Sequence, residues 1–341
     1  MSKRKEPVFS LNLFSSLFDT SHVTVTKRLK GKGISLEKDP ESGFYVIPLS
    51  LAKEIVKRRK ELELPVKQGM TFVFGNSKGG VGKTTISFAA AQVLGSFGFK
   101  VLVVDTDYQS YTISKLLIPK KETWDVGLRE LLELDNFPLE GIIRKSRYPN
   151  IFVIPANEKL KELVEAMDLT LLIAKLKKVI DESVKTFDLD FVIIDLPPTV
   201  SSIIKAAIHT ATAVVGVTLP HYTSFDQIAP LQRTVEETNL FKLSFGLSEA
   251  TLFPGIIVNK YEKRHSIDNA MVEVAKKIFG DLIISPFVPS YTSFKEMITV
   301  PHMTIEDFFP ASTCFYEIIL KIFQRIKKKG GENGKKQKGK A

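Results

Sequence analysis

A run of glycines and lysines is the part of the sequence whose residue types and spacing point most directly to chemistry. The segment Lys78–Thr85 reads KGGVGKTT, follows a short β-rich apolar run and precedes a stretch of small residues typical of a helix. Glycines let backbone N–H groups close on phosphate oxygens, and the N-terminus of the following helix adds a favourable dipole. The segment therefore predicts a loop that binds the phosphates of a nucleotide.

This loop departs from the strict pattern G-x-x-x-x-G-K-[ST], because the position five residues before Gly82 is Ser77. The variant that is present still predicts that Lys83 reaches the β- and γ-phosphates and that Thr84 binds Mg²⁺. The residues expected around the phosphates are Gly79, Gly80, Val81, Gly82, Lys83, Thr84 and Thr85.

The segment KGGVGKTT resembles the deviant Walker A box of the ParA/MinD family of dimeric ATPases, and the resemblance covers most of residues 71–324. It implies ATP and Mg²⁺ as cofactors and a slow hydrolysis that a partner accelerates. Lys78 matches the family's extra lysine, which reaches across a homodimer to the partner's phosphates and takes part in catalysis. The resemblance therefore implies that activity requires dimerisation.

Two acidic strand ends extend the resemblance. The segment VLVVDTDYQS resembles the family's D-x-D-x-Q segment, which implies that Asp107 positions the attacking water and Asp105 supports the magnesium shell. The segment FVIIDLPP resembles its Walker B segment, in which Asp195 holds Mg²⁺ through water. Ligands of parallel sheets bind at the carboxyl edge of the strands, so these positions are physically apt. By the same resemblance Asn259 contacts adenine and Pro289 lies in the adenine-side loop.

The elements that must hold these residues read as an α/β domain. Short β-rich runs, apolar on both faces, alternate with longer helical stretches and predict a doubly wound, mostly parallel sheet. The strands are expected at Thr71–Phe74, Val101–Asp105, Ile151–Ile154, Phe191–Asp195, Val214–Thr218 and Ile256–Asn259.

Domain boundaries follow from composition. The sequence ELELPVKQGM ends a charged helical run with Pro65 and Gly69, which is typical of a linker. A last helix is expected at about Cys314 to Ile326, before a glycine- and lysine-rich end. We therefore expect an N-terminal region at 1–64, a linker at 65–70, the ATPase domain at 71–326 and a disordered basic tail at 327–341.

The N-terminal region predicts helices around a hairpin. Helices are expected at Phe9–Phe18, Val23–Lys30 and Leu49–Lys60, with residues 31–48 between them forming the hairpin and Pro40–Gly43 its tip.

That order resembles the winged helix-turn-helix of the longer ParA proteins, which repress their own operon. The resemblance implies DNA contacts in the major groove, with Lys32 or Lys38 from the wing on phosphate. A small helical oligomerisation module with a solvated basic face stays open as the alternative. The residues expected in the groove are Thr24, Thr26, Lys27 and Lys30.

Charge and composition bound the class of protein. The formal net charge is +10; residues 1–70 hold 14 Lys/Arg against 8 Asp/Glu, and residues 325–341 hold 8 against 1. Basic ends suit polyanion binding, although a merely solvated tail is an equal alternative. No apolar run is long enough for a membrane span, and we expect a cytoplasmic protein. The single cysteine, Cys314, excludes an internal disulfide and, within one chain, a cysteine-based metal site.

The family resemblance implies a plasmid or chromosome partition ATPase, associated with the nucleoid, that binds DNA without sequence preference and is stimulated by a centromere-binding, ParB-like protein. Arg264 falls where the family has a DNA-contacting arginine, whereas Ser293 stands in place of a second one. A MinD-like membrane-associated positioning ATPase is the alternative. It is disfavoured because the apolar positions of the last helix follow the spacing of a core helix, and MinD-like proteins lack the N-terminal module. The nitrogenase iron protein, another relative, requires two cysteine ligands per subunit, and this chain has only one cysteine, so that function is excluded.

Overall fold

The structure is a computed structural model of the 341-residue chain. It describes residues 6–134, 138–199, 201–247, 249–290 and 303–338, with side chains as far as residue 329.

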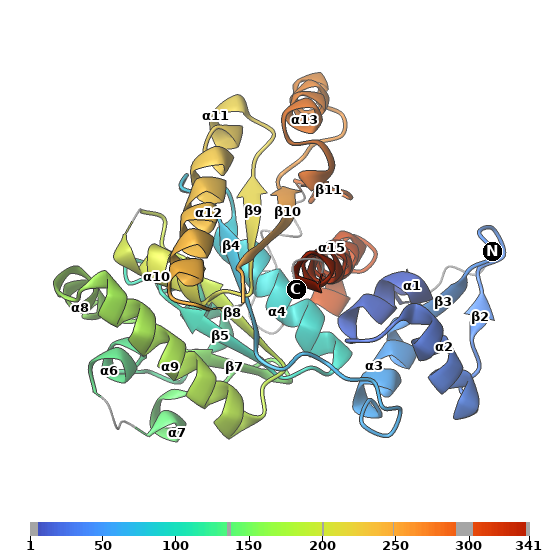
Figure 1. Cartoon of the computed structure of the whole chain (residues 1–341), viewed down its shortest axis with the longest axis horizontal. Coiled ribbons are helices and arrows are strands. Elements are labelled where there is room, and N and C mark those ends of the chain that lie inside the picture. The colour runs from blue at the N-terminus through green and yellow to red at the C-terminus, as the bar shows by residue number, and fades with distance from the viewer. Residues whose placement is uncertain (1–5, 135–137, 200, 248, 291–302, 339–341) are drawn as a thin grey trace.

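An eight-stranded sheet forms the centre of the ATPase region (Figure 1). Its strands lie in the order β11-β10-β9-β4-β8-β5-β7-β6, and every neighbouring pair is parallel except β6 with β7. The predicted doubly wound, mostly parallel α/β fold is confirmed. The strands are β4 (Met70–Gly75), β5 (Val101–Asp105), β6 (Arg144–Lys145), β7 (Ile151–Ile154), β8 (Phe191–Asp195), β9 (Ala213–Thr218), β10 (Leu252–Val258) and β11 (Ile283–Ile284).

Helices cover both faces of this sheet. Along β4, Phe72 and Phe74 belong to the apolar cluster that contains α4 and α15, whereas Val73 belongs to the cluster on the opposite face with α9, α10 and α12. Strands buried on both faces explain the uninterrupted apolar runs of the sequence. These helices are α4 (Lys83–Phe97), α15 (Thr313–Lys338), α9 (Leu169–Phe187), α10 (Ser202–Thr210) and α12 (Ile228–Ser244).

Further helices complete the ATPase region. They are α5 (Thr112–Leu117), α6 (Leu128–Glu133), α7 (Leu139–Ile142), α8 (Leu160–Ala166), α11 (Tyr222–Phe225), α13 (Ser266–Phe279) and the 3-10 turns η2 (Gly280–Leu282) and η3 (Ile305–Phe308).

The N-terminal region forms a three-stranded antiparallel sheet, in the order β1-β3-β2, with three helices. The predicted hairpin and second helix are confirmed. The predicted first helix is wrong at its start, because Phe9 pairs with Ile47 in the sheet before the chain turns helical. The elements are β1 (Val8–Ser10), α1 (Leu11–Phe14), the 3-10 turn η1 (Ser15–Leu17), α2 (His22–Gly31), β2 (Glu37–Lys38), β3 (Tyr45–Pro48) and α3 (Leu49–Lys57).

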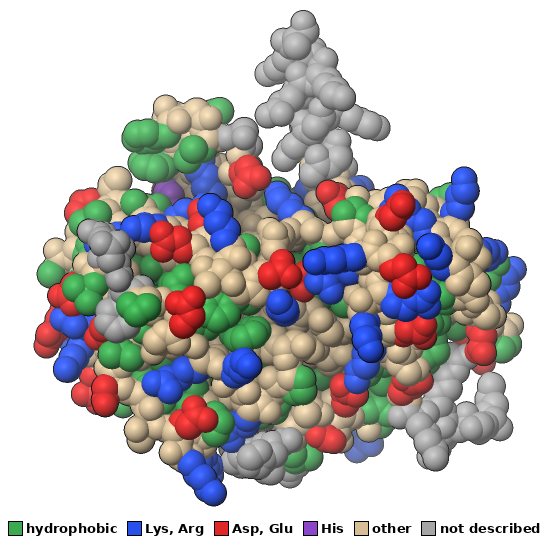
Figure 2. Space-filling model, turned by 90° about the horizontal axis from the view of Figure 1, so that it is seen from below, with side chains coloured by type: hydrophobic (Ala, Val, Ile, Leu, Met, Phe, Trp, Pro, Cys, Tyr) green, Lys and Arg blue, Asp and Glu red, His purple; other side chains and the backbone are tan. Residues whose placement is uncertain are grey.

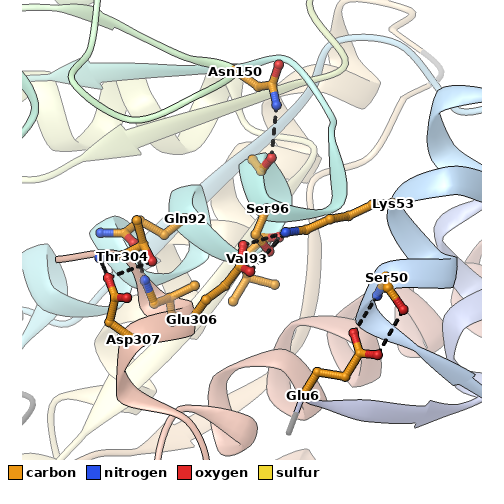
Figure 3. Close-up of polar contacts among 12 residues, drawn as sticks. Glu6, Ser50, Lys53, Gln92, Val93, Ser96, Asn150, Thr304, Glu306 and Asp307 are labelled. Atoms are coloured by element: carbon orange, nitrogen blue, oxygen red, sulfur yellow. Dashed lines mark hydrogen bonds and ion pairs between the residues drawn. The ribbon is translucent and has the colours of Figure 1, made fainter. Parts of the chain in front are cut away.

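One apolar cluster runs from this region into the ATPase region. The ring of Phe14 meets that of Phe97, at the end of α4, at 5.8 Å, and Phe97 meets Tyr316 of α15 at 5.6 Å. Figure 3 shows a polar contact beside them, where Lys53 of α3 donates to the Glu306 carboxylate of η3 at 2.8 Å. The N-terminal region is thus packed against α4, the helix that begins at the glycine loop.

The last helix is longer than predicted. The structure describes α15 as helix to Lys338, whereas the sequence predicted disorder from residue 327. Gly330, Gly331 and Gly334 lower the helix propensity of this extension, so the preferences of its residues do not account for the helix. Its apolar side chains are buried in the core, as their spacing predicted; they are Phe315, Ile318, Ile319, Ile322 and Phe323. Within the described residues, no helix has both the length and the apolarity that crossing a membrane requires.

Candidate nucleotide-binding site

The glycine loop connects β4 to α4, as the sequence predicted. Gly80 and Gly82 have φ of +75° and +95°, a left-handed region that side chains disfavour. A Cβ at Gly82 would collide with Nδ2 of Asn259. The backbone therefore requires glycine at position 82 for two independent reasons.

A Gly82→Ala variant is expected to lose nucleotide binding and to unfold at a lower temperature, because it meets both the unfavourable φ and the Asn259 side chain. Gly43→Ala is the matched control, since Gly43 has φ of +70° but no neighbouring atom within 4 Å of the point where its Cβ would lie. Equal losses of thermal stability in the two variants would contradict a steric role for Asn259.

A cavity of about 390 Å³ opens beside this loop at the carboxyl edge of the sheet. It brings together phosphate-loop residues, one candidate catalytic carboxylate and the expected adenine-side residues. The lining residues are Gly80, Gly82, Lys83, Thr84, Thr85, Asp107, Ser110, Leu196, Pro198, Asn259, Lys260, Val288, Pro289 and Ser290.

The amine of Lys83 points back into the loop. The side chain is only 6% exposed, and Nζ donates to the carbonyl of Lys78 at 3.2 Å. Burial lowers the pKa of this amine, while the carboxylates of Asp195 and Asp107 oppose the shift. A buried cation held by a loop carbonyl is well placed for an anionic ligand, whereas the two nearby carboxylates favour a further cation.

The carboxylate of Asp195 is buried, lacks a hydrogen-bond partner in the described part of the chain and is well suited to bind a cation. It ends β8 with no exposed surface, and neither of its carboxylate oxygens has a hydrogen-bond partner among the described residues. Burial raises its pKa to about 7; the hydroxyls of Ser87 and Thr84 oppose the rise without forming hydrogen bonds of ordinary geometry. An unsatisfied carboxylate near the Thr84 hydroxyl has the oxygen chemistry that Mg²⁺ prefers.

Asp105 differs from Asp195, although the two pair across β5 and β8. Its Oδ1 accepts from the N–H of Asp107 at 2.9 Å, and its Oδ2 accepts from both the N–H and the hydroxyl of Ser114 at 3.1 and 2.6 Å. Burial, followed by the charge of Asp195, raises the pKa of Asp105 to about 8. Asp105 is not among the residues that line the cavity. Its carboxylate therefore stabilises the turn after β5 through these hydrogen bonds.

Asp107 faces the cavity and is 4% exposed. Its Oδ1 accepts from the N–H groups of Gln109 and Ser110 at 3.0 and 3.2 Å, and its Oδ2 accepts from the Ser110 hydroxyl. Gln109 also donates to Thr199 at 3.2 Å, which joins this turn to the loop after β8.

The side chains of Asn259 and Lys260, directly after β10, form hydrogen bonds to the glycine loop. Nδ2 of Asn259 donates to the carbonyl of Val81 at 2.8 Å, and Nζ of Lys260 donates to that of Gly80 at 3.1 Å. Lys260 has φ of +54°, unusual for a lysine. Pro289 lies beside them, bridged to Tyr261.

Lys78 lies outside the cavity in this single chain. Its Nζ donates to Thr223 of α11 at 2.8 Å, and its N–H donates to Oδ1 of Asn76 at 2.8 Å. The amine is therefore turned away from the phosphate loop of its own chain.

The proposed DNA contacts lie on two separate elements. Lys30 on α2 donates to the Tyr45 hydroxyl at 2.9 Å, and Thr26 donates to the carbonyl of His22 at 2.8 Å. Arg264 is exposed in the turn before α13, apart from α2, and Ser293 lies outside the described residues. A second cavity, of about 830 Å³, borders α2 and β3 and is lined by Ser10, Leu11, Asn12, His22, Val23, Thr26, Lys27, Lys30, Phe44 and Tyr45.

Sequence reasoning missed three lining residues of consequence. Lys260 directly follows the predicted Asn259, and Leu196 directly follows Asp195, so adjacency was an available signal. Ser110 follows Asp107 by three positions, the spacing at which a hydroxyl returns to a turn carboxylate.

Comparison with known proteins identifies the family of the chain. The AAA domain family AAA_31 matches residues 69–243. The chromosome-partitioning ATPase Soj of Treponema pallidum is 29% identical over 232 residues, covering 67% of this chain and 86% of that protein. The sporulation initiation inhibitor protein Soj of Bacillus subtilis is 28% identical, covering 67% and 87%.

Solved structures share the fold. The ATP complex of a McdA variant from Cyanothece has a TM-score of 0.61 at 20% identity and covers 78% of this chain and 98% of its own. A plasmid partition protein from Borrelia burgdorferi bound to AMPPNP has a TM-score of 0.57 at 20% identity and covers 75% and 98%. The family match across the phosphate loop, together with the two Soj relatives, establishes that the chain belongs to the ParA/MinD family of deviant Walker A ATPases.

Proposed function

We propose that this chain is a partition ATPase for a plasmid or a chromosome: it binds ATP with Mg²⁺, dimerises on ATP, binds DNA and hydrolyses ATP slowly. The observation that carries the proposal is the site itself. Lys83, Thr84 and Asp107 border one cavity at the carboxyl edge of the sheet, and the unsatisfied carboxylate of Asp195 lies next to Lys83 and Thr84.

The residues present fit a magnesium ion. Thr84 and Asp195 would hold it, because a hydroxyl and a buried carboxylate without hydrogen-bond partners supply hard oxygen ligands. Asp105, with three donors on its carboxylate, supports the site through the turn instead. When bound, Mg²⁺ supplies positive charge to the phosphate oxygens.

The chain's own residues account for the remaining steps. The N–H groups of the glycine loop and the N-terminus of α4 bind the phosphates, and Lys83 neutralises charge on the transferred group. Asp107, held by its own turn, orients the attacking water. Asn259 and Pro289 face the base; each polar atom of the Asn259 amide keeps hydrogen-bonding capacity beyond the bond it already makes.

Lys78 would complete the site of a partner copy. A single exposed hydrogen bond to Thr223 holds its amine, so little free energy opposes its reorientation across a dimer interface. The family resemblance of KGGVGKTT supports this assignment.

DNA binding rests on the resemblance and on the charge of the N-terminal region and the tail. The order β1-α1-α2-β2-β3 supports a winged helix-turn-helix that contacts an operator through Thr24, Thr26, Lys27 and Lys30. Non-specific binding would involve Arg264. Figure 2 shows Lys/Arg and Asp/Glu side chains interleaved on the face seen from below, so that face offers no single basic field. The cytoplasmic nucleoid is the proposed location, and a ParB-like protein the stimulating partner.

The membrane-positioning alternative receives no support from α15. The apolar side chains that would enter a bilayer pack instead against the sheet and α4, with Phe323 at 5.3 Å from Phe72 and 5.2 Å from Phe191 between ring centroids. Exposing these side chains would remove the apolar contacts through which α15 covers the core.

Random-sequence duplex DNA is expected to shift in a gel with ATP, but not with ADP or without nucleotide, because only the ATP-bound dimer presents two DNA-binding surfaces together. Lys78→Ala is expected to abolish the ATP-dependent shift while keeping nucleotide binding. Lys145→Ala, on the edge strand β6, is the matched control. Nucleotide-independent binding, or none, would contradict the proposed switch.

A further inference from the structure

The turn after β5 contains a hydroxyl whose position the proposed mechanism does not yet use. Ser110 borders the 390 Å³ cavity, and its Oγ donates to Oδ2 of Asp107, while its N–H donates to Oδ1 of the same carboxylate at 3.2 Å. One residue therefore holds both oxygens of the group proposed to orient water.

The direction of the hydroxyl proton follows from a second contact. Thr112, the first residue of α5, donates its hydroxyl to Oγ of Ser110 at 3.0 Å. Because Asp107 as a carboxylate only accepts, the Ser110 proton points to Oδ2. The result is a chain of donors from Thr112 through Ser110 to Asp107, and it fixes the rotation of the carboxylate about its last side-chain bond.

The two oxygens of Asp107 are held differently. Oδ1 accepts from two backbone N–H groups, of Gln109 and Ser110, which no side-chain substitution removes. Oδ2 accepts only from the Ser110 hydroxyl among the described residues. A carboxylate oxygen has room for a further donor, so Oδ2 is both the oxygen that Ser110 positions and the oxygen with capacity for a water.

We propose that Ser110 is a positioning residue for hydrolysis: its hydroxyl holds Oδ2 of Asp107 toward the attacking water. This inference rests on the proposed role of Asp107. Ser110 acts through Asp107 and leaves nucleotide affinity to the glycine loop.

The test measures steady-state ATP hydrolysis by the full chain. Ser110→Ala is expected to lower kcat about tenfold, the loss expected for one hydrogen bond to a charged group, with the KM for ATP unchanged within about twofold. Ser110→Thr keeps the hydroxyl and is expected to restore most of the rate. Ser244→Ala, whose hydroxyl only caps the end of α12, is the matched control and should leave kcat unchanged.

A double-mutant cycle separates this inference from the proposed function. Ser110→Ala should cause no further loss in an Asp107→Ala background if the hydroxyl acts through that carboxylate. A raised KM with unchanged kcat, or an additive loss in the double variant, would overturn the positioning role. Full hydrolysis by Asp107→Ala alone would instead overturn the role of Asp107 in the proposed function.

Discussion

Lys83→Ala should lower kcat/KM for ATP hydrolysis by about 10²–10³-fold, the loss typical of removing one preorganised charge-stabilising donor. Lys83 as a residue is 6% exposed and its amine interacts with two carboxylates, so it acts in a region from which water is largely excluded. The truncated side chain would leave Asp195 and Asp107 facing the phosphates without a compensating cation. Repulsion between like charges then opposes both nucleotide binding and the transition state.

Lys260→Ala is the informative control for this variant, because Lys260 borders the same cavity but has an exposed amine. We expect a loss of less than tenfold there. Isothermal titration with ATP and a phosphate-release assay measure the two steps separately. If Lys83→Ala and Lys260→Ala lost activity equally, the assignment of Lys83 to the γ-phosphate would be wrong.

The glycine loop and its strand were predictable because their physical requirements leave a mark in the sequence. Gly80 and Gly82 occupy left-handed positions, and a strand buried on both faces must be apolar throughout. The order of elements around β4 therefore followed from the sequence pattern.

The different surroundings of two neighbouring aspartates were not predictable. Asp105 and Asp107 share one motif, yet Asp105 binds Ser114 inside the protein while Asp107 borders the cavity. The choice depends on the turn after β5, including Tyr111 with φ of +39°, which residue types alone do not define.

The attachment of the N-terminal region was also beyond sequence reasoning. The linker pattern near Pro65 predicted a boundary, but one apolar cluster continues through Phe14, Phe97 and Tyr316. Each of these residues reads as an ordinary core position, and only long-range packing brings them together. The strand at Phe9 was mistaken for helix for the same reason, since its partner Ile47 is remote in sequence.

In metal-free buffer containing a chelator, Asp195→Asn should raise the thermal unfolding midpoint at pH 8 and raise it much less at pH 5. The ordinary pKa of an aspartate is 3.8, and burial raises that of Asp195 to about 7. The folded state therefore holds this proton more tightly than the unfolded state. Its contribution to stability is present below about pH 4 and is lost as pH rises through 7.

The gain at pH 8 is on the order of a few kcal/mol, because the asparagine removes an ionised group with no hydrogen-bond partner from a fully buried site. The variant also removes the charge that helps to raise the pKa of Asp105, which adds to the effect. Asp181→Asn, on the exposed face of α9, is the control and should shift neither midpoint appreciably. Adding Mg²⁺ with ATP should raise the unfolding midpoint of the wild type far more than that of the Asp195→Asn variant. The variant should also have lost ATP hydrolysis. A variant that is less stable than the wild type at pH 8 without metal would mean that another group already satisfies the Asp195 carboxylate.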